Sequence, residues 1–158
     1  MWIGKGDGMD RNVTAFALAF LLCVGHLYGG TRFDGSWSAS ADKHSFTVDG
    51  LSVASLRLET RGDVLHETLQ VAPQADGRTL TLQYRLDGDE TSNDLAGRKT
   101  RCRAWRQGAQ LVIEWRWEDS TGLRRIFTEG DEGVRMLIQH FEPGRLDMNT
   151  IGLRKVSK

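Results

Sequence analysis

Residues 79–86 read Thr-Leu-Thr-Leu-Gln-Tyr-Arg-Leu, and this stretch decides the fold class. Its apolar side chains stand at every second position, namely Leu80, Leu82, Tyr84 and Leu86. A two-residue period is typical of a β-strand with one face buried and one face in water. Residues 111–118 repeat the pattern, because Leu111, Ile113, Trp115 and Trp117 alternate with Val112, Glu114, Arg116 and Glu118.

Similar short runs continue in both directions from residue 31 onward, separated by turn signals, and no helical period accompanies them. The runs predict nine strands at Phe33–Ala39, Ser52–Arg61, Val64–Ala72, Thr79–Leu86, Arg98–Trp105, Leu111–Glu118, Leu123–Thr128, Val134–Glu142 and Asn149–Lys155. The polar stretch 87–97 is expected to be a loop. We therefore expect an all-β fold, an antiparallel up-and-down β-barrel of about eight to nine strands, because closing the sheet removes its exposed edges.

Composition limits the function classes. The chain has 158 residues, of which 39% are hydrophobic, and this suits one domain with a real core, expected at 31–158. The 21 basic and 21 acidic side chains balance, so the charge gives no general attraction to nucleic acid or to an anionic membrane surface. The basic residues are spread along the chain, which indicates solvated strand faces.

The N-terminal segment 1–30 resembles a signal peptide. Val13 to Val24 is an apolar run of 12 residues that follows Arg11, and a membrane-spanning helix needs about 20. We expect this signal helix to export the chain to the periplasm or outside the cell, with an uncleaved membrane anchor as the alternative. The true start is either Met1 or Met9. Lipidation at Cys23 is disfavoured, because leucines rather than small residues precede it.

Removal of residues 1–30 would leave Cys102 as the one cysteine, so no internal disulfide could form. The fold would then depend on its apolar core alone. We expect Cys102 to be a small buried hydrophobe rather than a reactive thiol.

Three motifs carry a resemblance to a known family. They read Gly35-Ser36-Trp37, Tyr84-Arg85-Leu86-Asp87-Gly88-Asp89-Glu90, and Trp105 through a turn to Leu111-Val112-Ile113. Their order resembles the lipocalin and fatty-acid-binding superfamily, and in particular bacterial secreted lipocalin-like domains. The resemblance implies a closed barrel end in which Trp37, after Gly35, packs under a basic residue of the last strand, for which Arg154 is the candidate.

The same resemblance implies a carrier of a small apolar or amphipathic molecule, held in the barrel and oriented by Tyr84 or an inward arginine. The expected ligand-binding residues are Leu56, Leu82, Tyr84, Ile113, Trp115, Phe127 and Met136. An aromatic, apolar wall suits such a ligand, but it equally suits ordinary core packing. The alternative is therefore a filled barrel that serves as a structural or protein-interaction module of the cell envelope and contacts a partner through its arginine-rich outer faces. We expect a monomer in either case.

Other candidate chemistry is weak. His44, His66 and His140 lack metal-ligand spacing, and the acidic stretch Asp87–Asp94 lacks the spacing of a calcium loop, so we expect no metal and no cofactor. Arg61-Gly62-Asp63 is interpreted as a turn. An enzyme on the same barrel is the least favoured hypothesis; its candidate carboxylates, Glu67 and Glu114, have nothing in the sequence that brings them together.

Overall fold

The computed structural model describes residues 31–40, 45–72, 78–95 and 97–156, and every regular element in these ranges is a β-strand. The strands are β1 (Gly35–Ala39), β2 (Phe46–Val48), β3 (Leu51–Arg61), β4 (Val64–Val71), β5 (Thr79–Arg85), β6 (Thr91–Leu95), β7 (Arg98–Gln107), β8 (Gln110–Arg116), β9 (Gly122–Gly130), β10 (Gly133–Glu142) and β11 (Arg145–Lys155). These ranges contain no helix long and apolar enough to cross a membrane. The expected signal segment 1–30 and His44 lie outside the described residues.

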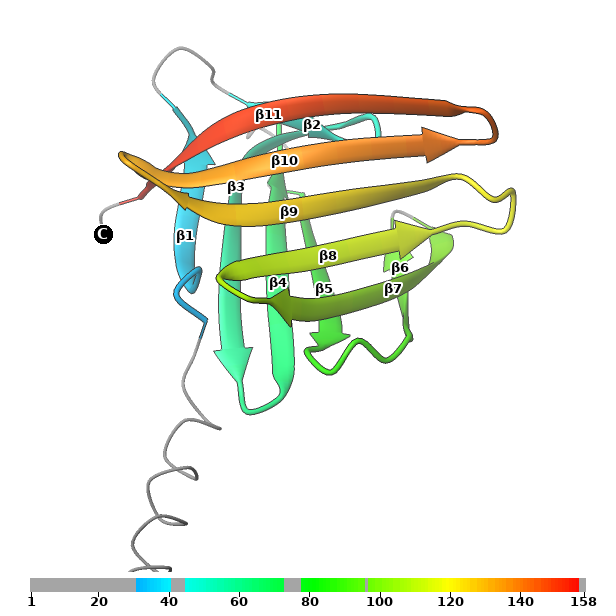
Figure 1. Ribbon diagram of the computed structural model, residues 1–158, viewed down its shortest axis with the longest axis horizontal. Coiled ribbons are helices and arrows are strands. Elements are labelled where there is room, and N and C mark those ends of the chain that lie inside the picture. Colours follow the sequence, from blue (N-terminus) through cyan, green and yellow to red (C-terminus); the bar gives the residue numbers. More distant parts are fainter. Residues whose placement is uncertain (1–30, 41–44, 73–77, 96, 157–158) are drawn as a thin grey trace, which may run out of the picture.

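The strands form one antiparallel sheet in the order β5-β4-β3-β1-β11-β10-β9-β8-β7-β6, with β2 paired to β3. The sheet curls round until its two ends, β5 and β6, lie side by side (Figure 1). The predicted fold class, an all-β antiparallel barrel, is thereby confirmed. The short N-terminal strand β1 lies between β3 and the C-terminal β11, so both halves of the chain meet along it.

Two strands were not among the nine expected, β2 and β6. The prediction of a loop across 87–97 is wrong for Thr91–Leu95, which pairs with β7 along its whole length. Leu95 is the buried residue of this strand and its other side chains are half or fully exposed, so it shows no apolar alternation. A strand held by backbone pairing at the end of a sheet needs little apolar side-chain burial.

The alternation in the decisive stretch is confirmed. Leu82 and Tyr84 of β5 are buried, whereas Thr81, Gln83 and Arg85 are exposed. The buried side chains of β5 join those of the other strands in one core cluster inside the barrel. One shared interior therefore holds the fold together.

One end of the barrel is closed around Trp37, whose indole N–H donates to the carbonyl of Phe33 at 2.7 Å. Gly35 has a φ of +142°, a backbone conformation that favours glycine, and it lies close to the Lys155 side chain. The basic residue over Trp37 is Lys155, whose Nζ lies 5.9 Å from the ring centroid. The prediction of Arg154 is wrong: Arg154 is opposite Ser38, and neighbouring residues of a strand point to opposite faces.

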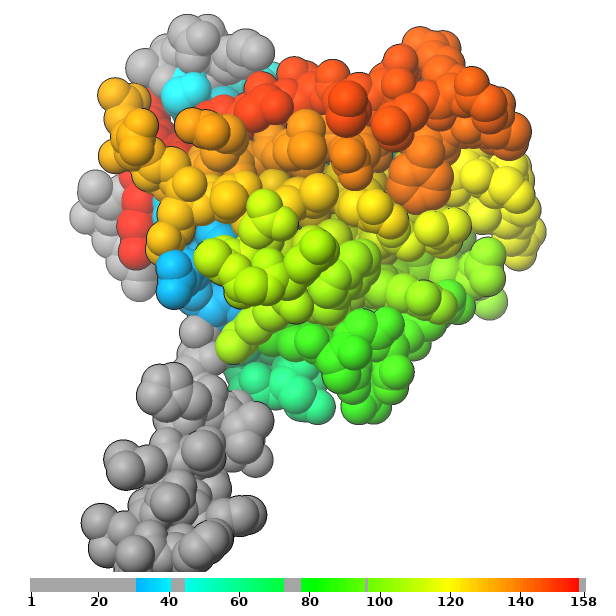
Figure 2. Space-filling model, in the orientation of Figure 1, coloured from blue at the N-terminus to red at the C-terminus, as the bar shows by residue number. Residues whose placement is uncertain are grey.

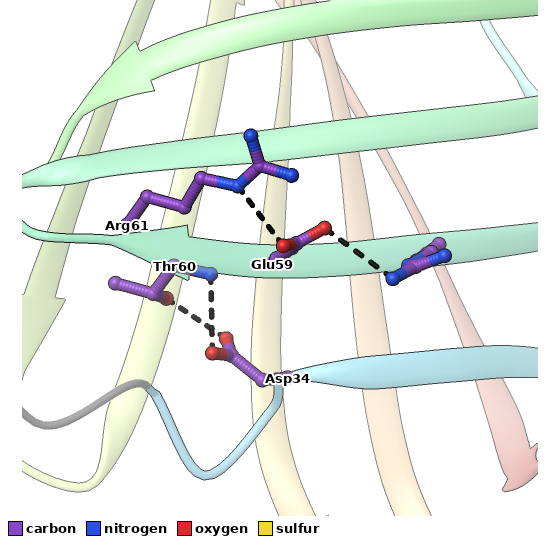
Figure 3. A network of polar contacts seen from close by, with 5 residues as sticks. Asp34, Glu59, Thr60 and Arg61 are labelled. Atoms are coloured by element: carbon purple, nitrogen blue, oxygen red, sulfur yellow. Dashed lines mark hydrogen bonds and ion pairs between the residues drawn. The ribbon is translucent and has the colours of Figure 1, made fainter.

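A polar clasp ties the start of β1 to β3 at the same end (Figure 3). The Asp34 carboxylate accepts from the Thr31 hydroxyl at 2.7 Å, and from the Thr60 hydroxyl at 2.8 Å and backbone N–H at 3.1 Å. Glu59, on the other face of β3, pairs with Arg61 in the open (Figure 3). Exposed pairs of this kind contribute little to stability, so the Asp34 clasp is the structural contact here.

Candidate functional site

The barrel interior is the candidate site. It contains all seven residues that the sequence singled out as ligand-binding: Leu56, Leu82, Tyr84, Ile113, Trp115, Phe127 and Met136. They come from β3, β5, β8, β9 and β10, and each is buried in the common core cluster. The structure therefore brings the whole set together, and its contact with a ligand stays a prediction.

Side chains fill the interior around these residues. Leu65, Leu69, Ile113, Leu123 and Phe127 have 0% of their surface exposed. A void wide enough for a water molecule would expose part of the side chains lining it, so these residues pack directly on one another. A ligand entering this region must displace side chains that are already in contact.

A buried polar cluster crosses this apolar interior. Arg125 of β9 forms a bidentate ion pair with Glu67 of β4, in which Nη1 donates to Oε1 and Nη2 donates to Oε2 at 2.8 Å. Both side chains are 0% exposed. The Tyr84 hydroxyl donates to Glu67 Oε2 at 2.7 Å, and the Trp115 indole N–H donates to the Tyr84 oxygen at 2.9 Å. The guanidinium carbon of Arg125 lies 4.3 Å from the Trp115 ring centroid, a cation–π contact.

The cluster carries almost no net charge. Burial and the nearby Glu67 carboxylate raise the pKa of Tyr84 well above its usual value, so the phenol stays protonated. Burial alone would lower the pKa of Arg125, but the charge and hydrogen bonds of Glu67 outweigh it and the pKa is raised. One carboxylate thus neutralises one guanidinium. The Nε atom of Arg125 has no hydrogen-bond partner among the described residues.

Sequence reasoning considered an inward arginine but did not identify Arg125 or its pairing with Glu67. A signal was present, because Glu67 stands between Leu65 and Leu69 at the period of a buried face, and Arg125 stands in the same way between Leu123 and Phe127. The possible catalytic pair of Glu67 and Glu114 does not form. Glu67 points into the barrel, whereas Glu114 lies on the outer face of β8 between Arg116 and Arg124.

The seam between β5 and β6 is joined by side chains. The Asn93 amide Nδ2 donates to the Gln83 carbonyl at 2.8 Å, and its Oδ1 accepts from the Gln83 N–H at 2.9 Å. The side chain thus takes the place of a backbone peptide, and the Thr91 hydroxyl adds a bond to the same carbonyl at 3.2 Å. A surface hollow of about 460 Å³ lies over the seam and reaches Tyr84 of the buried cluster.

Cys102 lies beside this seam and is fully buried. Burial raises the pKa of its thiol to about 11, and the Asn93 side chain partly opposes this shift. The expectation that Cys102 is buried is confirmed, and its low reactivity stays a prediction.

The other residues considered as metal or binding candidates do not come together into a site. His140 is half-buried near the end of β10, and the described residues contain no group of three or more His, Cys, Asp or Glu side chains that could hold a metal ion. Asp87 pairs with Arg85, and Glu90 pairs with Arg103, on the barrel surface. Residues 61–63 turn from β3 into β4 at Gly62, with a φ of +64°, as the turn interpretation expects.

Only comparison with solved structures finds proteins similar to this chain. No protein-family model and no curated protein matches the chain. A fatty acid binding protein of Schistosoma mansoni, in complex with arachidonic acid, matches with a TM-score of 0.61 and 11% identity over 82% of this chain and 100% of that one. An abundant heat soluble (SAHS) protein of Ramazzottius varieornatus matches with a TM-score of 0.60 and 10% identity, over 82% and 98% of the two chains.

A third similar structure is lipid binding protein 8 of Caenorhabditis elegans, with a TM-score of 0.57 and 9% identity over 78% of this chain and 95% of that one. At such low identity these likenesses establish the architecture only. The chain therefore shares the barrel architecture of these proteins, in agreement with the antiparallel barrel expected from its strands.

Proposed function

We propose that this chain is a non-catalytic barrel that binds a small apolar or amphipathic molecule in its interior. The observation that carries the proposal is the single apolar interior, which contains the charge-neutral cluster of Glu67, Tyr84, Trp115 and Arg125. Burying a ligand there would gain about 25 cal/mol per Å² of apolar surface. Structural neighbours described as fatty acid and lipid binding proteins support the same class of ligand.

The cluster sets the polarity of the ligand. Both terminal nitrogens of Arg125 are bonded to Glu67, so an anionic ligand would have to displace a buried carboxylate and leave it unpaired. Leaving a buried charge without its partner costs several kcal/mol. An uncharged polar end, such as a hydroxyl, can approach Tyr84 and Trp115 without this penalty. The preferred ligand is therefore apolar with an uncharged polar end.

The test uses the full chain and the neutral apolar dye Nile red. We expect the folded protein to bind the dye, and a long-chain fatty alcohol to displace it at lower concentration than the fatty acid of the same length. Leu69→Ala enlarges the interior and should tighten dye binding. Thr68→Ala, at the neighbouring position whose side chain points the other way, should leave dye binding unchanged. Equal binding by both variants, or none by the folded wild type, contradicts an interior ligand.

A filled-barrel interaction module is the second candidate, and the absence of exposed surface on Leu65, Leu69 and Phe127 favours it. Native mass spectrometry of the protein purified from its own host separates the two. A retained small molecule supports the carrier. A ligand-free protein that also excludes Nile red supports the filled module.

We also propose that residues 1–30 direct export, so that the barrel works in the periplasm or outside the cell. The apolar run of 12 residues after Arg11 supports this. Fusing residues 1–30 to a reporter that is active only outside the cytoplasm tests it, and the intact mass of the recovered protein shows whether the segment is removed. An inactive fusion contradicts export.

A further inference from the structure

The outer face of the barrel gathers arginines over β7, β8 and β9. Arg103, Glu114 and Arg124 stand opposite one another across the three strands, and their neighbours along each strand face the core. The next outward row is Trp105, Val112 and Ile126. Figure 2 shows the outer surface of β8, β9 and β10 toward the viewer, in yellow-green to orange. The fold thus places a charged row directly beside an apolar row on one surface.

A surface hollow of about 610 Å³ lies on this face. We call its central residues the arginine face; they are Arg103, Trp105, Arg106, Glu114, Arg116 and Arg124. Its size is within the range of binding sites, and it is open to solvent rather than enclosed. It is separate from the barrel interior.

Glu114 organises the arginine face from beneath. Its carboxylate accepts from Arg116 Nε at 2.7 Å through one oxygen, and from Arg124 Nε at 2.9 Å and Nη2 at 2.6 Å through the other. Burial would raise the pKa of Glu114, but the hydrogen bonds from Arg116 and Arg124 lower it overall, so the carboxylate stays ionised. The Glu114 side chain is only 6% exposed, whereas Arg116 is 51% and Arg124 is 38% exposed.

The face keeps a positive surplus. Four arginines line the hollow, against the carboxylates of Glu114 and Asp87 in its lining and of Glu90, which pairs with Arg103 at its border. Arg116 donates to Glu114 through Nε, its side chain is 51% exposed, and its guanidinium lies 5.1 Å from the Phe141 ring centroid. An exposed guanidinium that is held in place is suited to bind an incoming carboxylate through two parallel hydrogen bonds.

An aromatic surface adjoins these donors. Trp105 is half-exposed, and Val112 beside it is 0% exposed although it points out of the barrel, because neighbouring side chains cover it. Tryptophan and arginine together are enriched at the energetic centres of protein interfaces. This combination distinguishes the arginine face from an ordinary solvated strand face.

We propose that the arginine face docks an acidic segment of a partner protein, with carboxylates on Arg103, Arg116 and Arg124 and an apolar side chain on Trp105. A protein segment is favoured over nucleic acid, because the chain has no net charge and Asp87 and Glu90 lie at the border of the face. A polyanion of uniform negative charge, such as nucleic acid, would be repelled by these carboxylates. A protein segment can instead match the mixed pattern residue by residue. This interaction goes beyond the interior ligand and does not depend on it.

The experiment measures binding of a fluorescent extended peptide, with glutamate at every second position, to the full chain at low salt. The triple variant Glu114→Gln, Arg116→Gln and Arg124→Gln removes two positive charges and the carboxylate that they hold, so that no buried charge is left unpaired. It should weaken peptide binding at least tenfold. The matched control is Arg135→Gln on β10, which changes the net charge equally and should alter affinity less than twofold.

Cooperative thermal unfolding of each variant shows that it is folded, and Arg103→Gln alone gives a milder variant that should also weaken binding. The same binding measurement is repeated with the glutamine version of the peptide, with inorganic phosphate and with single-stranded DNA. Loss of binding with the glutamine peptide supports the proposal. It is overturned if the folded wild type does not bind the acidic peptide, if the triple variant binds as well as wild type, or if phosphate or DNA binds the face more tightly. Nile red binding is a separate readout, so failure here is distinct from failure of the interior site.

Discussion

Glu67 and Arg125 show how much a single pair of residues can decide. Each is buried on an apolar strand face, and each is acceptable there only because the other lies opposite across the barrel. Their pairing sets both the stability of the interior and the charge of any ligand that it accepts. Removing one partner of such a pair is strongly destabilising, because it leaves the other charge buried without its counter-charge.

Glu67→Gln should destabilise the protein by about 3–5 kcal/mol, because it leaves the Arg125 guanidinium buried without its counter-charge. Urea unfolding of the full chain measures the loss. The control is Glu129→Gln, which breaks the exposed pair with Arg32 and should shift the free energy of unfolding by less than about 0.5 kcal/mol. Equal small losses in the two variants would show that the interior pair does not form.

Cys102 gives a prediction about pH. Burial raises the pKa of its thiol from the usual 9.0 to about 11 in the folded protein. Between these values the unfolded thiol loses its proton while the folded one keeps it, so stability present below pH 9 should fall as the pH approaches 11. Tyr84, with a raised pKa, adds to this fall in the same direction. Urea unfolding at pH 8 and pH 10 should therefore show a smaller loss for Cys102→Ala than for wild type; equal losses contradict the assignment.

Among the elements, strands with one clean apolar face were predictable and strands at the sheet ends were not. The alternation in β5 marks its buried face directly, because every second side chain is apolar. In β8 the same alternation identifies the inward side chains, although Val112 and Glu114 of the outer face are buried as well. Strand β6 has no such row, and its place depends on backbone pairing with β7, which leaves no local pattern. Asn93 joins the seam through a contact with β5 that no local pattern in β6 reveals.

Asn93→Asp should open the seam. A carboxylate can still accept from the Gln83 N–H, but it cannot donate to the Gln83 carbonyl and repels it instead. Losing one such bond costs about 1 kcal/mol, so amide hydrogen exchange at Gln83 should be about fivefold faster or more. Ser92→Ala is the neighbouring control and should leave the exchange unchanged. Unchanged exchange in Asn93→Asp would mean that the amide does not hold the seam.

The two glycines of β9 form a matched pair. A Cβ at Gly122 would lie 2.2 Å from the Phe141 ring and 2.8 Å from the Trp115 carbonyl oxygen, whereas a Cβ at Gly130 would lie 3.8 Å from its nearest neighbour. Gly122→Ala should therefore destabilise by about 1–3 kcal/mol through overpacking. Gly130→Ala should have a smaller effect than Gly122→Ala. Thermal unfolding of the two variants compares them, and the reverse order would contradict the packing of Phe141 on β9.

At the scale of the whole molecule, the sequence predicted the closed barrel and the composition of its interior but not whether that interior is hollow. The alternating rows specify which side chains point inward, and the motifs around Trp37 and Tyr84 resemble those of known barrels. Whether facing side chains meet depends on the barrel radius and on pairings such as Glu67 with Arg125, which join residues far apart in the chain. Arginine-rich outer faces were part of the alternative hypothesis, but the sequence did not indicate which arginines lie together, since Arg103 and Arg124 are joined only across β8.

A filled interior makes a kinetic prediction. Because the interior side chains must separate before a ligand can enter, the observed rate of Nile red uptake should reach a plateau as dye concentration rises. The plateau is the rate of barrel opening, and Asn93→Asp should raise it. Stopped-flow fluorescence measures both. A rate that rises linearly to the highest dye concentration would indicate a cavity that is already open.

The position of β1 between β3 and β11 has a consequence for folding. Trp37, in the first strand of the barrel, is paired with Lys155 of its last strand, β11. Until β11 is available for pairing, β1 lacks one neighbour and the sheet cannot close. Pairings between such distant residues form slowly, because the loop between them must first be closed. The barrel can therefore close only after β11 has paired with β1, so we expect closure to be a late step of folding.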